Sequence, residues 1–199
     1  MKSVYLLLIA GILLSSCVEK QDTLNKKAAT IGEDAAMQLI GTLKQQVQQA
    51  VKKGGPVHAI QFCNENAIPL TNEVQNDLKK GMTIKRTSLK YRNPDNAPDE
   101  LEQKILEAYA QEIEQKQEMQ PYRLTVTGQG DNQVYHYFKP MKIAALCTTC
   151  HGIKSEMNPD LVSVLEKKYP QDKATGYQTG DFRGVVHVSI PENVVKSAK

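Results

Sequence analysis

The 199-residue sequence has few cysteines, no long basic run and a single long apolar run. Its four cysteines are too few to hold a disulfide scaffold together. The 25 lysines and arginines nearly balance 22 acidic residues and come in blocks of no more than two or three, so we expect no nucleic-acid partner. With 40% hydrophobic and 24% charged residues, the composition excludes wholesale disorder and a multi-span membrane protein. The length suits one ordinary domain.

The one long apolar run lies at the N-terminus. Lys2 precedes an almost unbroken apolar stretch over residues 4–14, which is too short to span a bilayer but typical of a secretory signal. The next residues, Leu14-Ser15-Ser16-Cys17, resemble the bacterial lipobox, where the cysteine receives a diacylglyceryl group and the chain is cleaved before it. A plain signal peptide with a coincidental cysteine is the alternative. We predict a lipoprotein signal peptide over residues 1–16 and lipidation of Cys17.

Lipid on Cys17 predicts a membrane anchor without a spanning helix, on the periplasmic side of the membrane. Val18 stands after the cysteine where an aspartate could, which favours the outer membrane of a two-membrane bacterium. The compartment is extracytoplasmic under either interpretation of the signal. Thiols there are lipidated, ligated or oxidised.

Periodicity and turn residues predict an α+β fold of helices on a small antiparallel sheet. Gly54-Gly55-Pro56, Ile68-Pro69 and Gly81 are expected to end the first three helices. The expected helices are residues 24–53, 57–67, 71–80, 96–113 and 158–168, and the expected strands are 82–89, 123–127, 133–141 and 185–190. We assign residues 17–55 to a lipid-anchored linker and N-terminal helix and residues 56–199 to the domain. The N-terminal helix would pack on its own domain or pair with a second copy in a homodimer.

The motif with the clearest chemistry is Cys147-Thr148-Thr149-Cys150-His151. C-x-x-C-H is the attachment signature of c-type haem. Two thiols on one tight turn can each add across a porphyrin vinyl group, and the adjacent His151 can then bind the iron as proximal ligand. Since the motif occurs once, we predict one covalently bound haem c.

Two other chemistries use a C-x-x-C pair. A thioredoxin-type redox centre needs a helix N-terminus that lowers the thiol pKa, but Gly152 follows the motif and no helix is expected before Asn158. A structural zinc site needs four ligands, and the sequence has no second C-x-x-C or H-x-x-x-H pair.

The second axial ligand is open from spacing alone, because methionine, histidine or an open site are all common in c-type centres. Cys63 has no disulfide partner left and lies on the apolar face of its helix with Ile60 and Ala67, so it is a ligand or a small buried hydrophobe. Arg86 and Arg92 could hold the haem propionates, or form a solvated strand edge. The remaining ligand candidates are Met82, Met119, Met141, Met157, His58, His136 and His187.

Four stretches carry a family resemblance: residues 59–63, 85–96, 147–152 and 169–184. They are Ala59-Ile60-Gln61-Phe62-Cys63, the run from Lys85-Arg86-Thr87 to Asn93-Pro94-Asp95-Asn96, the C-x-x-C-H motif with Gly152, and Tyr169-Pro170-Gln171-Asp172 through Gly184. From about residue 32 to residue 191 the chain resembles extracytoplasmic c-type-haem domains of PAS-like fold, found as stand-alone lipoproteins and as input domains of membrane histidine kinases. The resemblance implies a PAS-like sheet with flanking helices and Cys63 as the distal iron ligand opposite His151. The chain has no kinase portion, so a signalling output would need a protein partner.

A histidine–thiolate pair favours the ferric state and leaves no open position on the iron. We therefore predict redox or gas sensing, or electron transfer with a redox partner, rather than catalysis. Reduction, NO or CO would release Cys63 and shift its helix. The alternatives are a haem peroxidase or reductase with an open distal site, and a non-haem thiol oxidoreductase acting through Cys147 and Cys150.

Overall fold

A computed structural model describes the backbone of residues 3–198, and the side chains from Glu19 onward except that of Asp131. The predicted signal peptide and the lipidation of Cys17 therefore lie outside the described side chains. The helices are α1 (Ser3–Asp77), α2 (Glu100–Glu114), α3 (Thr148–His151), α4 (Pro159–Lys168) and α5 (Glu192–Ser197). The strands are β1 (Thr83–Thr87), β2 (Arg123–Thr127), β3 (Val134–Lys142) and β4 (Phe182–Pro191). Among the described residues, none of the helices has both the length and the apolar character to cross a membrane.

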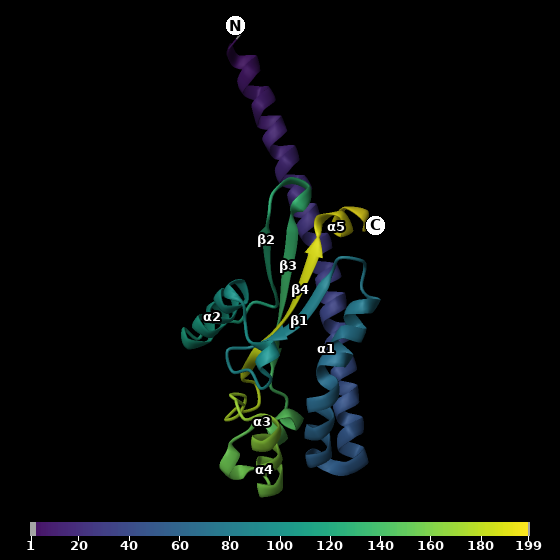
Figure 1. The fold of residues 1–199 in the computed structure, drawn as a ribbon. Coiled ribbons are helices and arrows are strands. Elements are labelled where there is room, and N and C mark those ends of the chain that lie inside the picture. Colours follow the sequence, from purple (N-terminus) through teal and green to yellow (C-terminus); the bar gives the residue numbers. More distant parts are fainter. Residues whose placement is uncertain (1–2, 199) are drawn as a thin grey trace.

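The four strands form one antiparallel sheet in the order β1-β4-β3-β2, with helices around it (Figure 1). The predicted α+β class, with a small antiparallel sheet, flanking helices and a long N-terminal helix, is confirmed. Side chains alternate along the strands, so that Tyr135 and Tyr137 of β3 join the core under α1. Phe138 joins the core under α2, with Leu106 and Tyr109.

The long helix α1 consists of two arms that bend at Gly54 and Gly55. Gly55 has a φ of 74°, in the left-handed region that glycine adopts without strain, so the predicted stop at this point is a sharp reversal. Figure 1 shows the two arms side by side. The first arm places Ala35 and Leu39 in the same core as the sheet. The N-terminal helix is therefore part of the main core.

The predicted helix break at Ile68-Pro69 is wrong, because the second arm runs without interruption to Asp77. A proline inside a helix removes one backbone donor and disturbs the preceding turn. Two side chains contact backbone carbonyls in this region: Asn66 Nδ2 donates to Phe62 O at 2.9 Å and Thr71 Oγ1 donates to Ala67 O at 2.8 Å. Pro69 leaves the backbone carbonyl of Glu65 without its intrahelical donor, but the helix continues on both sides of it. Cys63 consequently lies on a long continuous helix.

Several further elements differ from the sequence prediction, and α2, for example, begins at Glu100 rather than at residue 96. Strand β4 begins at Phe182, three residues before the predicted start at 185, and contains Gly184 with a φ of 146°. A Cβ on Gly184 would lie 2.3 Å from Thr87 O, so glycine allows β4 to approach β1 beside the irregularity at Met141/Lys142. The short helices α3 and α5 were not predicted.

Candidate functional site

The C-x-x-C-H motif lies on two successive short turns after β3. The 3₁₀ turn Ala145–Cys147 leads directly into α3, and Thr148 Oγ1 donates to Ala145 O at 2.7 Å. The two motif cysteines thereby enter different apolar surroundings. Cys147 packs on the cluster of Ile143, Ala174 and Tyr177, and Cys150 packs on the cluster of Ile60, Leu161, Leu165 and Tyr169 from α1, α4 and the turn after α4.

His151 is held in one tautomer. Its Nδ1 lies 2.7 Å from Ala174 O, and since a carbonyl only accepts, Nδ1 carries the proton and Nε2 the free lone pair. Burial, with Arg92 and Arg183 adding to its effect, holds the pKa of His151 well below its usual value. The imidazole is therefore neutral at pH 7, which is the form that binds a metal through Nε2.

The structure brings Cys63 from the second arm of α1 to the motif. Burial raises the pKa of the Cys63 thiol, and the charges of Arg86 and Arg92 act against that effect. Burial also raises the pKa of Cys150, with Arg92 opposing and Cys63 adding to the rise, so the two thiols share one environment.

Arg86 points a polar group into this site without a partner. It lies on β1, half-buried, and its Nε is shielded from solvent and finds no hydrogen-bond partner among the described residues. Burial lowers the pKa of Arg86, while Cys63 raises it and Arg183 lowers it further. A buried guanidinium with an unused donor is suited to an anionic group such as a carboxylate.

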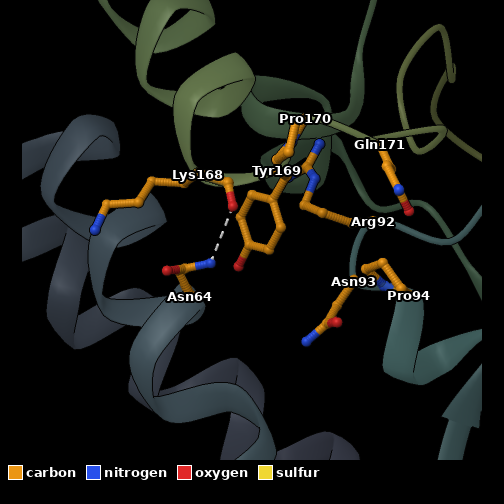
Figure 2. Close-up of a pocket in the computed structure, with 8 residues that line it drawn as sticks. All are labelled: Asn64, Arg92, Asn93, Pro94, Lys168, Tyr169, Pro170 and Gln171. Carbon is orange, nitrogen blue, oxygen red and sulfur yellow. Dashed lines mark hydrogen bonds between the residues drawn. The ribbon is translucent and has the colours of Figure 1, made fainter.

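Arg92, in contrast, is bound to the protein itself. Its Nε donates to Asp172 Oδ2 at 3.1 Å, and its Nη2 donates to Cys150 O at 2.6 Å and Ala174 O at 3.2 Å. Figure 2 shows Arg92 beside Tyr169 at a pocket of about 290 Å³ that Asn64, the neighbour of Cys63, also lines. Of the two arginines predicted for propionates, Arg86 therefore has a buried donor to spare, while Arg92 joins the motif to the turn at Asp172.

Sequence reasoning assigned no chemistry to Arg183, which also lies near the motif. Its Nη1 donates to Lys90 O at 2.9 Å, and its guanidinium lies 5.5 Å from the centre of the Tyr177 ring. Burial lowers the pKa of Arg183, and Tyr177 opposes this while Arg92 adds to it. The nearby glycines, Gly180 and Gly184, signalled a loop in the sequence but did not identify the arginine as a neighbour of the motif.

The other ligand candidates are mostly elsewhere. His136 and His187 face α2 and contact each other at 2.9 Å between Nδ1 and Nε2. Met82 and Met141 pack in or on the core under α1, and Met119 packs on the core under α2. Met157 packs on the same cluster as Cys150, so it is the candidate methionine that shares a cluster with the motif. Within the described part of the chain, no group of three or more His, Cys, Asp or Glu side chains could hold a metal ion.

The donor set fits a porphyrin, which supplies four iron ligands and needs only axial groups from the protein. His151 offers a lone pair at Nε2, Cys63 comes from a second element, and Arg86 has a buried donor without a partner. The two motif cysteines lie in apolar surroundings that would exclude water from a macrocycle. These residues therefore fit the haem that the motif predicts.

The fold and the site define the class of this protein as a small α+β domain with a C-x-x-C-H motif between β3 and α4. Comparison with known proteins then gives its family. The chain belongs to the Tll0287-like family, whose model matches residues 18–191. The crystal structure of the cyanobacterial haem protein Tll0287 is similar to it, with 25% sequence identity and a TM-score of 0.58 over 79% of this chain and 91% of that chain. No curated protein matches the chain. The resemblance to a haem-protein family found in the sequence is confirmed at this level.

Proposed function

We propose that this chain is a haem-binding protein with one c-type haem at Cys147, Cys150 and His151, and with Cys63 as the second axial ligand. The observation that carries the proposal is the packing of the motif on the arm of α1 that carries Cys63, where Cys150 contacts the cluster that includes Ile60, beside a His151 whose Nδ1 donates to Ala174 O. Membership of a family with a solved haem protein supports it.

Each residue has a defined part in this proposal. The thiols of Cys147 and Cys150 would hold the porphyrin by adding their S–H groups across its two vinyl groups, which needs no outside oxidant. The iron would supply one-electron redox chemistry. His151 would bind it through Nε2, Cys63 would bind it through sulfur after losing its proton to solvent, and Arg86 would donate its unused Nε–H to a propionate.

Two axial protein ligands leave no position for a substrate, so we propose sensing or electron transfer rather than catalysis. In the sensing form, one electron from a reduced partner protein, or binding of NO or CO, would release Cys63. The released thiolate would take up a proton from solvent, and the second arm of α1 would be free to move. CO binding to the reduced protein would support this form. A reduced protein with an unchanged ligand set and no CO or NO binding would contradict it.

The ligand assignment is tested with protein exported by a host that matures c-type cytochromes. We expect the low-spin thiolate signature in the ferric absorption and EPR spectra of the wild type to be lost in Cys63→Ala. The matched control Met157→Leu, on the same apolar cluster, should keep it. Identical spectra for the wild type and Cys63→Ala would disprove Cys63 ligation.

The same preparation tests the alternatives. A colourless protein with titratable thiols at Cys147 and Cys150 would overturn the haem proposal and favour a thiol oxidoreductase. A high-spin ferric spectrum with peroxide turnover would favour a haem enzyme. Covalent attachment predicts that the mass of the polypeptide includes one haem, and that Cys147→Ser together with Cys150→Ser abolishes it.

For the location we propose a lipid on Cys17 that anchors the chain to an extracytoplasmic membrane face, of the outer membrane in a two-membrane bacterium. Cys17→Ser should move the protein from the membrane fraction to the soluble periplasmic fraction. A wild-type N-terminal peptide without lipid mass would contradict the anchor and favour a plain signal peptide.

A further inference from the structure

One backbone carbonyl links the motif histidine to an arginine. Ala174 O accepts from His151 Nδ1 at 2.7 Å and also from Arg92 Nη2 at 3.2 Å. The segment around Ala174 lies along the motif, because Tyr177 N donates to His151 O at 2.9 Å and Gly176 N donates to Gly152 O at 2.7 Å.

The Ala174 peptide is fixed on both sides by one ion pair. Asp172 Oδ1 accepts from Ala174 N at 2.7 Å, while Asp172 Oδ2 accepts from Arg92 Nε at 3.1 Å. Arg92 also donates to Cys150 O at 2.6 Å, inside the motif. The side chains of Arg92 and Asp172 are only 11% and 4% exposed, so water competes little for these bonds. Arg92 therefore bridges the backbone of the motif and the carbonyl that orients its histidine.

We propose that Arg92 is a positioning residue that sets the orientation and electron-donating strength of His151 through the Ala174 carbonyl; this rests on the proposed haem function. A ligating histidine donates more electron density to iron when its other N–H is strongly hydrogen-bonded. A carbonyl that also accepts from a guanidinium is a poorer acceptor for the imidazole N–H. Arg92 thus weakens the donor character of His151 and holds the reduction potential above the value that Ala174 O would give by itself.

The experiment compares haem-loaded wild type with Arg92→Met, Arg92→Lys and Asp172→Asn, and with Arg183→Met as the matched control. Arg183 also carries a positive charge that acts on His151, but it donates to Lys90 O rather than to Ala174 O. The two readouts are the midpoint potential and the NMR resonance of the His151 Nδ1–H proton.

Loss of either arginine removes a positive charge and should lower the midpoint potential. Of these two variants, Arg92→Met should also shift the Nδ1–H resonance, in the direction of a stronger hydrogen bond, and Arg183→Met should not. Asp172→Asn should shift the resonance as well. Arg92→Lys keeps the charge but cannot reach three acceptors with a planar fork, so its resonance should shift with a smaller change in potential. An Nδ1–H resonance in Arg92→Met equal to that of the wild type would overturn the proposal.

If Arg92→Met does not fold, Arg92→Lys and Asp172→Asn decide, and unshifted resonances in both would overturn the proposal. A failure of the haem function itself is recognised separately, because the wild type would then be colourless. In that case the NMR chemical shifts of the His151 imidazole nitrogens in the haem-free chain test the same link. They should change in Arg92→Met, Arg92→Lys and Asp172→Asn, but not in Arg183→Met. Unchanged nitrogen shifts there would overturn it too.

Discussion

Glu102 is a fully buried carboxylate whose oxygens all have donors. His187 Nδ1 lies 2.9 Å from Oε1, and Lys85 Nζ and the Asp99 backbone N–H each donate to Oε2 at 2.9 Å. Burial by itself would raise the pKa of Glu102, but the hydrogen bonds from His187, Lys85 and Asp99 lower it to about 2. Since a carboxylate only accepts, His187 Nδ1 carries a proton towards Glu102, and His187 Nε2 lies 2.9 Å from His136 Nδ1.

This arrangement predicts an acid-dependent part of the stability. Since the folded pKa is lowered from 4.5, the contribution is fully present above pH 4.5 and is lost as the pH falls through about 2. The loss is on the order of 3 kcal/mol for the wild type. Glu102→Gln should be less stable at pH 7, and its difference from the wild type should shrink between pH 5 and pH 2, as measured by urea unfolding. The exposed Glu107→Gln on the same helix is the control and should follow the wild type at every pH.

Arg86 leads to a prediction with opposite signs in the two forms of the protein. In the haem-free chain its buried Nε has no partner among the described residues, so Arg86→Met should raise the free energy of unfolding, by about 1–3 kcal/mol. In the haem-loaded chain the same change removes a propionate partner and should lower it.

Chemical unfolding of both forms measures this difference. Arg123→Met is the matched control, because Arg123 also has a buried Nε without a partner among the described residues but pairs with Glu112 on the α2 side of the sheet. It should lower stability in both forms alike. Parallel behaviour of the two variants would show that Arg86 has no role towards haem.

At the scale of elements, the contact between α1 and β3 depends on one glycine. A Cβ on Gly32 would lie 2.2 Å from Tyr137 Cγ, whereas a Cβ on Gly41 of the same arm would meet no described atom within 4 Å. The two positions differ in packing but share the helical backbone. Alanine substitutions at the two positions therefore separate the effect of overpacking between α1 and the sheet from the general helix preference of alanine.

Gly32→Ala should therefore destabilise the protein by about 1–3 kcal/mol through overpacking. Gly41→Ala should stabilise it by roughly 0.5–1 kcal/mol, since alanine is the better helix former. Thermal or urea unfolding measures both changes. Equal effects of the two substitutions would mean that α1 does not approach β3 as closely as the structure has it.

Some elements could be predicted because short sequence patterns mark them, either by a capping residue at the start of a helix or by the alternation of a strand. Asn158-Pro159 marked the start of α4, where Asn158 Oδ1 accepts from Asp160 N at 2.8 Å, and the alternation at residues 123–127 marked β2. The continuation of α1 through Pro69 was not predictable, because a proline ends most helices and the packing of the whole arm outweighs that local preference here. Of the candidate site, the sequence predicted the motif as the haem attachment point, and the family resemblance implied Cys63; both stay predictions.

The partners around the motif were not predictable. Ala174 has no polar side chain, so nothing in the sequence marks its carbonyl as the acceptor for His151. The link from Arg92 to Asp172 joins residues 80 positions apart, and only the tertiary fold brings them together. Short-range patterns carry no information on such pairings.

At the scale of the molecule, the site is assembled from segments far apart in the chain: the second arm of α1, the end of β1, the motif and the turns before β4. A bond from iron to Cys63 would tie that arm to the motif. In the haem-loaded ferric protein we expect slower amide hydrogen exchange over residues 56–70 than in the ferrous protein. Cys63→Ala should show no difference between the two oxidation states, and a wild type without one would contradict movement of this arm.

The first arm of α1 also determines where the motif stands relative to the start of the chain. Residues 19–53 form a helix of roughly 50 Å at about 1.5 Å per residue, and Figure 1 places its bend beside α3 and α4, at the opposite end of the molecule from the N-terminus. A chain tethered at Cys17 could hold its haem as far from the lipid headgroups as this helix is long. With that arm upright on the membrane, a redox or signalling partner would need a part that extends a comparable distance into the aqueous space to reach the haem.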